Sequence, residues 1–173
     1  LIEDLIMFTF AEHEQIVISK HEFDLISTIQ EAISIFQNNL LPVKIAFNKN
    51  TADLSIIVMA DQKKIQWVIN QLIENAIKFS KGDSIIEINL DNQPDYVKIS
   101  ILDNGIGIPQ DKLTEIFEPF HQLDSSSTRK AGGIGLGLAL AKKIIEAHGS
   151  RFVVKSKINV GSQFDFSLRK LIK

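Results

Sequence analysis

Three polar side chains on one predicted helix offer ligands for a metal cation and for a phosphate group. Gln71, Asn75 and Lys78 stand at i, i+4 and i+7, so a helical repeat places them on one side, at the edge of an apolar stripe. An amide oxygen is a ligand for a hard cation, and a lysine ammonium attracts a phosphate. Taken alone, the same three residues are also compatible with an ordinary solvated helix face.

Two glycine-containing segments complement that helix. Asp103 follows a predicted strand and precedes Gly105 and Gly107, whose missing side chains let the backbone pass close to a flat ligand while the carboxylate accepts a hydrogen bond. Residues 132–138 (GGIGLGL) lead into a helix, where free backbone N–H groups attract an anion. A common turn is the alternative for the first segment, and a hinge or close helix packing is the alternative for the second.

A fourth segment predicts a mobile loop. Residues 116–120 (IFEPF) provide two phenylalanine anchors, and residues 121–130 (HQLDSSSTRK) are polar and end on Arg129 and Lys130. Mobile loops next to phosphate sites often serve as lids. An ordinary surface loop is the alternative.

The elements that must position these segments follow from residue spacing. Apolar residues recur with a helical period in residues 25–40, from the N-cap Asp61 to Ala76, and from Leu136 to a stop at Gly149. Strands are predicted at 43–47, 56–59, 86–90, 97–101, 152–154 and 164–168. Since each strand has one apolar face, we expect an α+β fold in two layers, with about three helices on one face of the sheet.

Composition limits the remaining classes of protein. The 173 residues are 45% hydrophobic with a formal charge of −2, which suits one packed domain and argues against a nucleic-acid-binding protein. The chain has no cysteine, which excludes a disulfide scaffold, a thiolate metal site and a cysteine nucleophile. No uncharged apolar run approaches the roughly 20 residues of a membrane helix, so we expect no direct membrane insertion by this chain.

In this order and spacing, the four segments resemble the N, G1, F and G2 boxes of the ATP-binding catalytic domain of sensor histidine kinases, which belong to the GHKL superfamily and share the Bergerat fold. The matching stretches are QLIENAIKFS at 71–80, DNGIGI at 103–108, FEPF at 117–120 and GGIGLGLAL at 132–140. The resemblance implies a mixed, mainly antiparallel sheet. It also implies a protein-histidine kinase that binds Mg-ATP and transfers the γ-phosphoryl group to a histidine of a dimerisation domain absent from this chain.

The resemblance further implies a role for each site residue. Asn75 would hold Mg²⁺ and, with Lys78, would act as the catalytic pair on the phosphates. Asp103 would accept a hydrogen bond from the adenine amino group, and Phe79 would lie against the nucleotide. The complete implied ATP site consists of Gln71, Asn75, Lys78, Phe79, Asp103, Gly105, Gly107, Ile108, Arg129, Lys130, Gly133, Gly135, Leu136 and Gly137.

Two positions depart from the family pattern. Gln71 stands where these kinases usually have Asn and the hydrolytic relatives have Glu, and an amide cannot accept a proton from water as a carboxylate can. Ile134 stands where many members have Thr, which removes a hydroxyl near the phosphates. Efficient free ATP hydrolysis is therefore not expected. Two alternatives stay open, a non-catalytic nucleotide-binding signalling module and a serine kinase of the anti-sigma type.

The phosphate-accepting histidine is not expected among the four histidines of this chain. His13 and His21 are each followed by Glu, but neither continues with the basic residue, Thr and Pro of the family motif. Both are interpreted as linker histidines. His121 and His148 are interpreted as structural.

Residues 1–20 are interpreted as the remnant of a dimerisation-domain helix with its linker, and residues 21–173 as the catalytic domain. The chain begins with Leu rather than Met, and residues 1–10 (LIEDLIMFTF) are strongly apolar. The expected partners are the phosphoacceptor domain of the same parent protein and the receiver domain of a response regulator, with no nucleic acid. A cytoplasmic location is expected, and the sequence leaves open whether the parent protein is membrane-anchored.

Overall fold

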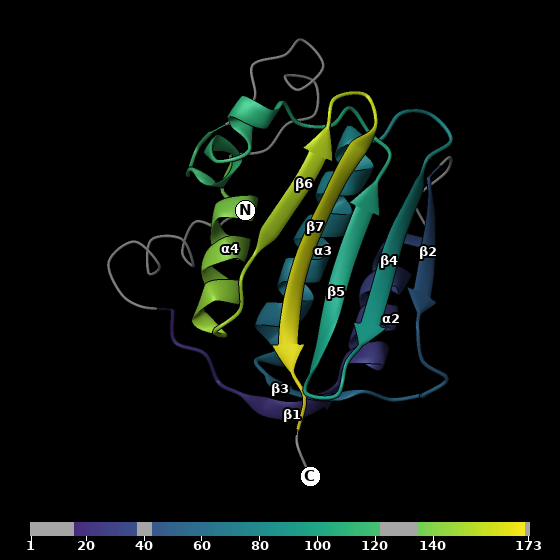
Figure 1. Cartoon of the computed structure of the whole chain (residues 1–173), viewed down its shortest axis with the longest axis vertical. Helices are drawn as coiled ribbons and strands as arrows, with labels where there is room; N and C mark the ends of the chain where they lie inside the picture. The colour runs from purple at the N-terminus through teal and green to yellow at the C-terminus, as the bar shows by residue number, and fades with distance from the viewer. Residues whose placement is uncertain (1–15, 38–42, 122–134, 172–173) are drawn as a thin grey trace.

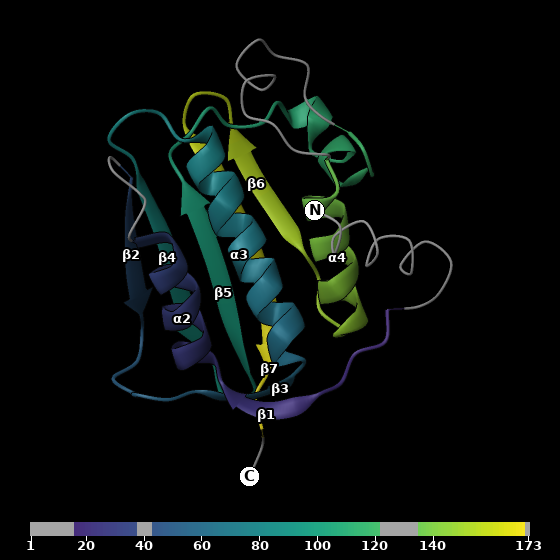
Figure 2. The same ribbon diagram turned by 180° about the vertical axis from the view of Figure 1, so that it is seen from behind.

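The computed structural model describes residues 16–37, 43–121 and 135–171, which form a two-layer α+β sandwich. Within this part of the chain, one layer is a five-stranded sheet and the other contains three α-helices on the same face of that sheet (Figure 1, and from behind in Figure 2). The helices are α2 (Leu25–Gln37), α3 (Gln62–Phe79) and α4 (Gly137–Ala147). The arrangement confirms the predicted fold class.

The strand order of the sheet is β2-β4-β5-β7-β6. The strands are β2 (Lys44–Lys49), β4 (Ile85–Asn92), β5 (Tyr96–Asp103), β6 (Val153–Lys157) and β7 (Gly161–Arg169). β2 runs parallel to β4 and the other neighbours are antiparallel, so the sheet is mixed and mainly antiparallel, as the resemblance implied. In the register between β5 and β7, Asp103 lies opposite Ser162.

A second, two-stranded sheet was only half predicted. β1 (His21–Asp24) pairs antiparallel with β3 (Ile57–Ala60). The interpretation of His21 as a linker residue is wrong, because His21 begins β1 and lies opposite Ala60. β1 has only four residues and one buried apolar side chain, Phe23, which is too short an alternation to recognise as a strand.

Other predicted boundaries shift in the structure or cannot be compared. β6 continues to Lys157, three residues beyond its predicted end. The prediction ended early because β6 is an edge strand whose later residues are polar and show no apolar alternation. Residues 1–10, His13 and residues 38–42, which include the predicted end of the first helix, lie outside the described residues. No helix in the part of the chain that the structure describes is long and apolar enough to cross a membrane.

The central helix α3 packs on the sheet through the predicted apolar stripe. Its buried residues are Ile65, Val68, Ile69, Leu72, Ile73 and Ala76. They share one core cluster with inward-facing strand residues such as Ile99 and Ile101. Each large side chain buried in this way contributes roughly 1.5–3 kcal/mol relative to an exposed position. Because this stripe faces the sheet, the orientation of the polar residues on the other sides of α3 is fixed.

The start of α3 is tied to the end of α4 through Asp61. The Asp61 side chain caps α3 by accepting from the N–H of Lys64 (3.2 Å), and it also accepts from the N–H of Ser19 (3.0 Å). The N–H of Asp61 donates to Nε2 of His148 (3.0 Å). Nδ1 of His148 must therefore carry the ring proton, which it donates to the Ile144 carbonyl (2.8 Å). The predicted N-cap and the structural role of His148 are both confirmed.

This contact predicts a loss of stability in mild acid. Burial lowers the pKa of His148 from its ordinary value of 6.5, so the unfolded chain takes up the proton first. The stability that the neutral ring provides is present above that ordinary value and is lost as the pH falls below it towards the folded-state pKa. Between about pH 7.5 and about pH 5.5, we expect the free energy of unfolding, measured in urea, to fall less in His148→Gln than in the wild type. Parallel pH profiles for the two proteins would contradict this role.

Candidate nucleotide-binding site

The predicted site residues that the structure describes lie along one side of the C-terminal half of α3 and around the end of β5. Phe79 ends α3 and Asp103 ends β5, both towards the upper edge of the molecule in Figure 1. α4 begins beside Gln71, about two turns earlier along α3. The site therefore has one end at the β5 terminus and another at the start of α4.

Asp103 has one oxygen bound to the protein and one oxygen free. Its Oδ1 accepts from the N–H of Gly105 (2.8 Å) and from the N–H of Ser162 (3.3 Å). Among the described residues, no group donates to Oδ2. Burial raises the pKa of Asp103 above its ordinary value, and the two N–H donors offset this only in part. The carboxylate is thus held in one orientation, with an acceptor oxygen available to a ligand.

The loop after Asp103 is joined to the end of α3 through the main chain. The N–H of Ile106 donates to the Phe79 carbonyl (3.2 Å). A Cβ atom on Gly105 would overlap this same carbonyl oxygen, so the approach requires glycine. Two of the predicted segments, the N-box helix and the DNGIGI loop, are therefore in direct contact, as the proposed boxes require.

The turn between β6 and β7 supports the other side of this loop. Gly107 has a φ of 69°, and a Cβ atom there would overlap the Lys157 carbonyl. The N–H of Asn159, in the turn, donates to the Ile106 carbonyl (2.8 Å). The loop is thus held between the end of α3 and the β6–β7 turn, and both glycines are required by this packing.

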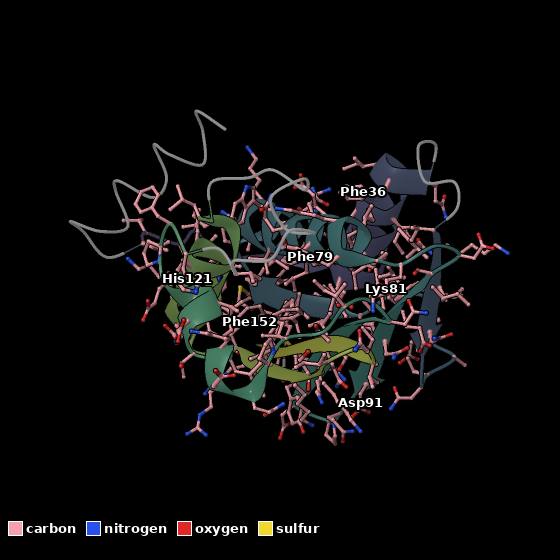
Figure 3. All side chains as sticks on the ribbon, turned by 90° about the horizontal axis from the view of Figure 1, so that it is seen from above. Phe36, Phe79, Lys81, Asp91, His121 and Phe152 are labelled. Carbon is pink, nitrogen blue, oxygen red and sulfur yellow. The ribbon has the colours of Figure 1, made fainter. Side chains whose placement is uncertain are left out.

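Three residues that contact this loop and its supports were not singled out in the sequence. The Ser156 hydroxyl accepts from the N–H of Ile108 (2.8 Å), and the N–H of Ser162 donates to Asp103. Lys81, beyond α3, donates to Oδ1 of Asn159 (2.7 Å), and Figure 3 labels Lys81 and Phe79 in a view from above. Neither serine has a spacing that predicts a role in the site.

At the other end of the site, Gln71 reaches the start of α4. Its Oε1 lies where a side chain on Gly137 would begin, and its Nε2 donates to the Glu74 carboxylate (3.3 Å). The N-cap of α4, Leu136, makes no side-chain capping hydrogen bond. The first N–H groups of α4 are thus without a capping side chain in the described part of the chain, as an anion site at a helix start requires.

Asn75 and Lys78 follow Gln71 on the same side of α3, as their spacing predicted. Nζ of Lys78 lies 5.1 Å from the centroid of the Phe79 ring. The three polar residues of α3 therefore lie along one side of the helix, between the contact of Gln71 with Gly137 and the contact of the Phe79 carbonyl with Gly105. The remaining predicted phosphate contacts, Arg129, Lys130 and Gly133, lie outside the described residues.

The F-box segment is anchored in the described part of the chain by the ring of Phe117. The Phe117 ring packs edge-on against Phe152 (centroids 5.7 Å apart). The Phe120 side chain is 58% exposed, and the N–H of Phe120 donates to the Gly135 carbonyl (3.1 Å). Nε2 of His121 lies 3.2 Å from the Glu115 carboxylate, in keeping with the structural role predicted for this histidine.

The fold is that of an ATP-binding domain of the Bergerat type. Residues 60–172 match the family model of histidine kinase-, DNA gyrase B- and HSP90-like ATPases. The chain belongs to this family. The resemblance to the GHKL superfamily is thereby confirmed.

Within the family, similar proteins include sensor histidine kinases. Sensor protein kinase WalK of Staphylococcus aureus is 34% identical over 170 residues, which cover 97% of this chain and 40% of the relative. The catalytic domain of histidine kinase ThkA superimposes with a TM-score of 0.75 at 28% identity, covering 88% of this chain and 96% of that domain. The fold is thus that of histidine kinase catalytic domains.

A further match is the crystal structure of histidine kinase ThkA in complex with response regulator protein TrrA. It superimposes with a TM-score of 0.78 at 25% identity and covers 98% of this chain and 47% of the kinase. The chain spans 40% or less of the WalK relatives, with 28% for the protein of strain Newman. The similarity thus concerns the catalytic part of longer proteins.

Asp103→Asn should stabilise the ligand-free domain while weakening nucleotide binding. Because the pKa of Asp103 is raised, the charged carboxylate costs stability at neutral pH, and this cost disappears below the ordinary value of 3.8. Asn keeps an oxygen for the two backbone donors but turns an NH₂ group towards the adenine amino group. Thermal unfolding should show a higher midpoint for Asp103→Asn at neutral pH, and calorimetry should show an affinity for Mg-ATP at least about tenfold lower.

Asp165→Asn is the matched control. Asp165 is only 4% exposed, but its hydrogen bond from Gln163 (2.8 Å) and its ion pair with Lys98 (3.1 Å) outweigh burial and lower its pKa. The same substitution there should destabilise the domain at neutral pH and leave the affinity for Mg-ATP unchanged. Stability changes of the same sign in the two variants would contradict a raised pKa for Asp103 together with a lowered pKa for Asp165.

Proposed function

We propose that this chain binds Mg-ATP and transfers the γ-phosphoryl group to a histidine of a separate dimerisation domain. The observation that carries the proposal is that one side of α3 has a hydrogen-bond acceptor at one end and hydrogen-bond donors at the other. Within the described residues, one end presents Oδ2 of Asp103, to which no group donates, and the other presents the start of α4 beside Gln71, which no described side chain caps. An adenine base and a chain of phosphates require these two kinds of group at the two ends of one site.

At the base end, the free Oδ2 of Asp103 accepts a hydrogen bond from the exocyclic amino group of adenine. Because both donors to Oδ1 are backbone N–H groups, the carboxylate has no rotational freedom to lose on binding. Phe79 at the end of α3 provides an apolar surface near the base. A guanine base, which has a carbonyl oxygen in place of the amino group, would be repelled.

At the phosphate end, the described chain provides amides and cations rather than a cluster of metal-ligating side chains. No group of three His, Cys, Asp or Glu residues able to hold a metal occurs in the described ranges. A Mg²⁺ ion would be held by the amide oxygen of Asn75 together with phosphate oxygens, and it would neutralise charge on the phosphates. The phosphates would be contacted by Lys78, by the cations Arg129 and Lys130, and by the N–H groups of Gly133, Gly135, Leu136 and Gly137.

Transfer to a protein histidine is favoured over hydrolysis by the residue at position 71. Gln71 is an amide and has no basic site to take a proton from water. Its Nε2 is also bound to Glu74, which holds its amide group beside Gly137. The chain's own residues therefore bind and orient ATP, while the nucleophile comes from another domain.

The proposed partner is a response regulator. In the ThkA complex the kinase is bound to a response regulator protein, and we infer a receiver domain of that kind as the final phosphate acceptor here. We place the catalytic domain in residues 21–173. We also place the domain in the cytoplasm, where ATP is available, whether or not the parent protein is anchored in a membrane.

Asn75→Asp tests the metal assignment. The new carboxylate adds a negative charge beside the phosphates. It should lower the affinity for Mg-ATP at least about tenfold and change the dependence of this affinity on Mg²⁺ concentration, as measured by calorimetry. Asn89→Asp on the open face of the sheet is the control, because its Oδ1 accepts from Asn48 and an aspartate can do the same. An unchanged Mg²⁺ dependence in Asn75→Asp would remove Asn75 as a ligand.

The transfer reaction is tested by adding the dimerisation domain of the parent protein to this chain with γ-labelled ATP. Phosphohistidine is labile in acid and stable in base, so we expect acid-labile label on the dimerisation domain, and its loss in Asp103→Asn. Binding of ATP without any transfer would favour a non-catalytic signalling module. Acid-stable label on a partner protein would favour a serine kinase.

A further inference from the structure

We propose that the Ser156 hydroxyl is a positioning group that sets the selectivity of the site for adenine. It does so by holding the loop of residues 103–109 against the β6–β7 hairpin. The inference rests on the proposed nucleotide-binding function. It concerns a residue of an edge strand that is itself not expected to touch the nucleotide.

Ser156 stands at the point where the hairpin meets the loop. Its Oγ accepts from the N–H of Ile108 (2.8 Å), lies 2.8 Å from the Gly161 carbonyl, and lies 3.0 Å from the Ser162 hydroxyl. Its own carbonyl accepts from Nε2 of Gln110, just beyond the loop (2.5 Å). One residue of β6 thus contacts the loop, the start of β7 and the residue that follows the loop.

Counting protons fixes the direction of these hydrogen bonds. A serine hydroxyl has one proton and two lone pairs. The proton of Ser156 is donated to the Gly161 carbonyl, because that oxygen can only accept, and one lone pair receives the Ile108 N–H. The contact with Ser162 must therefore use the Ser162 proton. Every bonding position of the Ser156 hydroxyl is then occupied by the protein.

The same chain of contacts ends on Asp103. The Ser162 hydroxyl donates to Ser156, and the Ser162 N–H donates to Oδ1 of Asp103 (3.3 Å). Ser162 is only 8% exposed, so a hydroxyl that lost its partner there would not be compensated by bulk water. Ser156 thus supports both the loop, through Ile108, and the direction of the carboxylate, through Ser162.

Removing this hydroxyl should affect recognition of the base more than binding of the phosphates. Without it, the Ile108 N–H, the Gly161 carbonyl and the Ser162 hydroxyl all lose a partner at once. The loop and Oδ2 of Asp103 then lose their fixed position, while α3 and the start of α4 do not depend on Ser156. Inosine triphosphate is the probe for this difference, because it has a carbonyl oxygen where ATP has the amino group.

The test compares the affinities of the wild type and Ser156→Ala for Mg-ATP, Mg-inosine triphosphate and Mg-tripolyphosphate by calorimetry. We expect the ratio of the ATP affinity to the inosine triphosphate affinity to fall about tenfold in Ser156→Ala, and the tripolyphosphate affinity to change less than about twofold. A loss of global stability by itself would leave the ratio unchanged, so thermal unfolding is measured in parallel.

Ser150→Ala is the matched control. Its hydroxyl accepts from the N–H of Ser167 (3.0 Å), so it also bonds the β7 backbone, but at the end of the hairpin away from the loop. Ser156→Cys is the second variant, because a thiol fills similar space and forms only weak hydrogen bonds. It should lower the affinity ratio as Ser156→Ala does.

A wild-type ratio in Ser156→Ala or Ser156→Cys overturns the inference, and so does an equal fall of the ratio in Ser150→Ala. If Ser156→Ala does not fold, the Ser156→Cys ratio decides. A wild-type protein that binds neither ATP nor inosine triphosphate refutes the proposed function instead, so the two failures are distinguishable.

Discussion

Two backbone N–H groups on one oxygen of Asp103 determine the direction in which the site can recognise a ligand. They come from Gly105, two residues along the chain, and from Ser162, which the register of β5 and β7 places opposite. Because the carboxylate is largely buried, its charge is costly, as the raised pKa of Asp103 shows. A group kept at that cost, with its second oxygen free, is suited to accept a hydrogen bond from a donor on a ligand. The β5–β7 register, the glycine loop and the β6–β7 turn all serve to hold this geometry.

The hydrophobic core determines the other half of the site. The apolar stripe of α3 faces the sheet, and the 3.6-residue repeat then leaves Gln71, Asn75 and Lys78 on one lateral side, towards α4. α4 is held in turn by its own buried residues and, at its far end, by the bond between the N–H of Asp61 and His148. The polar groups near the phosphates are therefore positioned by packing, while the base end is positioned by hydrogen bonds. This difference is the reason that substitutions at the two ends should affect different parts of a nucleotide.

Periodicity predicted α3, α4 and the strands β4, β5 and β7, because apolar residues recur at a regular spacing along their buried faces. The same signal was too short for β1, and His21 was consequently misassigned. The four motifs led to Asp103 and to the side chains of α3, whose chemistry is visible in the residue types. Ser156 and Ser162 could not be predicted in this way, since a serine gains its role only from the strand register that brings it to the loop. The contact of Gln71 with Gly137 likewise depends on how two helices pack.

The most direct measurement is a crystal structure of this chain with Mg²⁺ and a non-hydrolysable ATP analogue. The adenine amino group should lie within hydrogen-bond distance of Oδ2 of Asp103, with Oδ1 still bound to the N–H groups of Gly105 and Ser162. The phosphates should lie between Asn75 and the start of α4. An adenine bound away from Asp103, or a carboxylate that has turned to release Gly105 and Ser162, would contradict the proposed recognition of ATP.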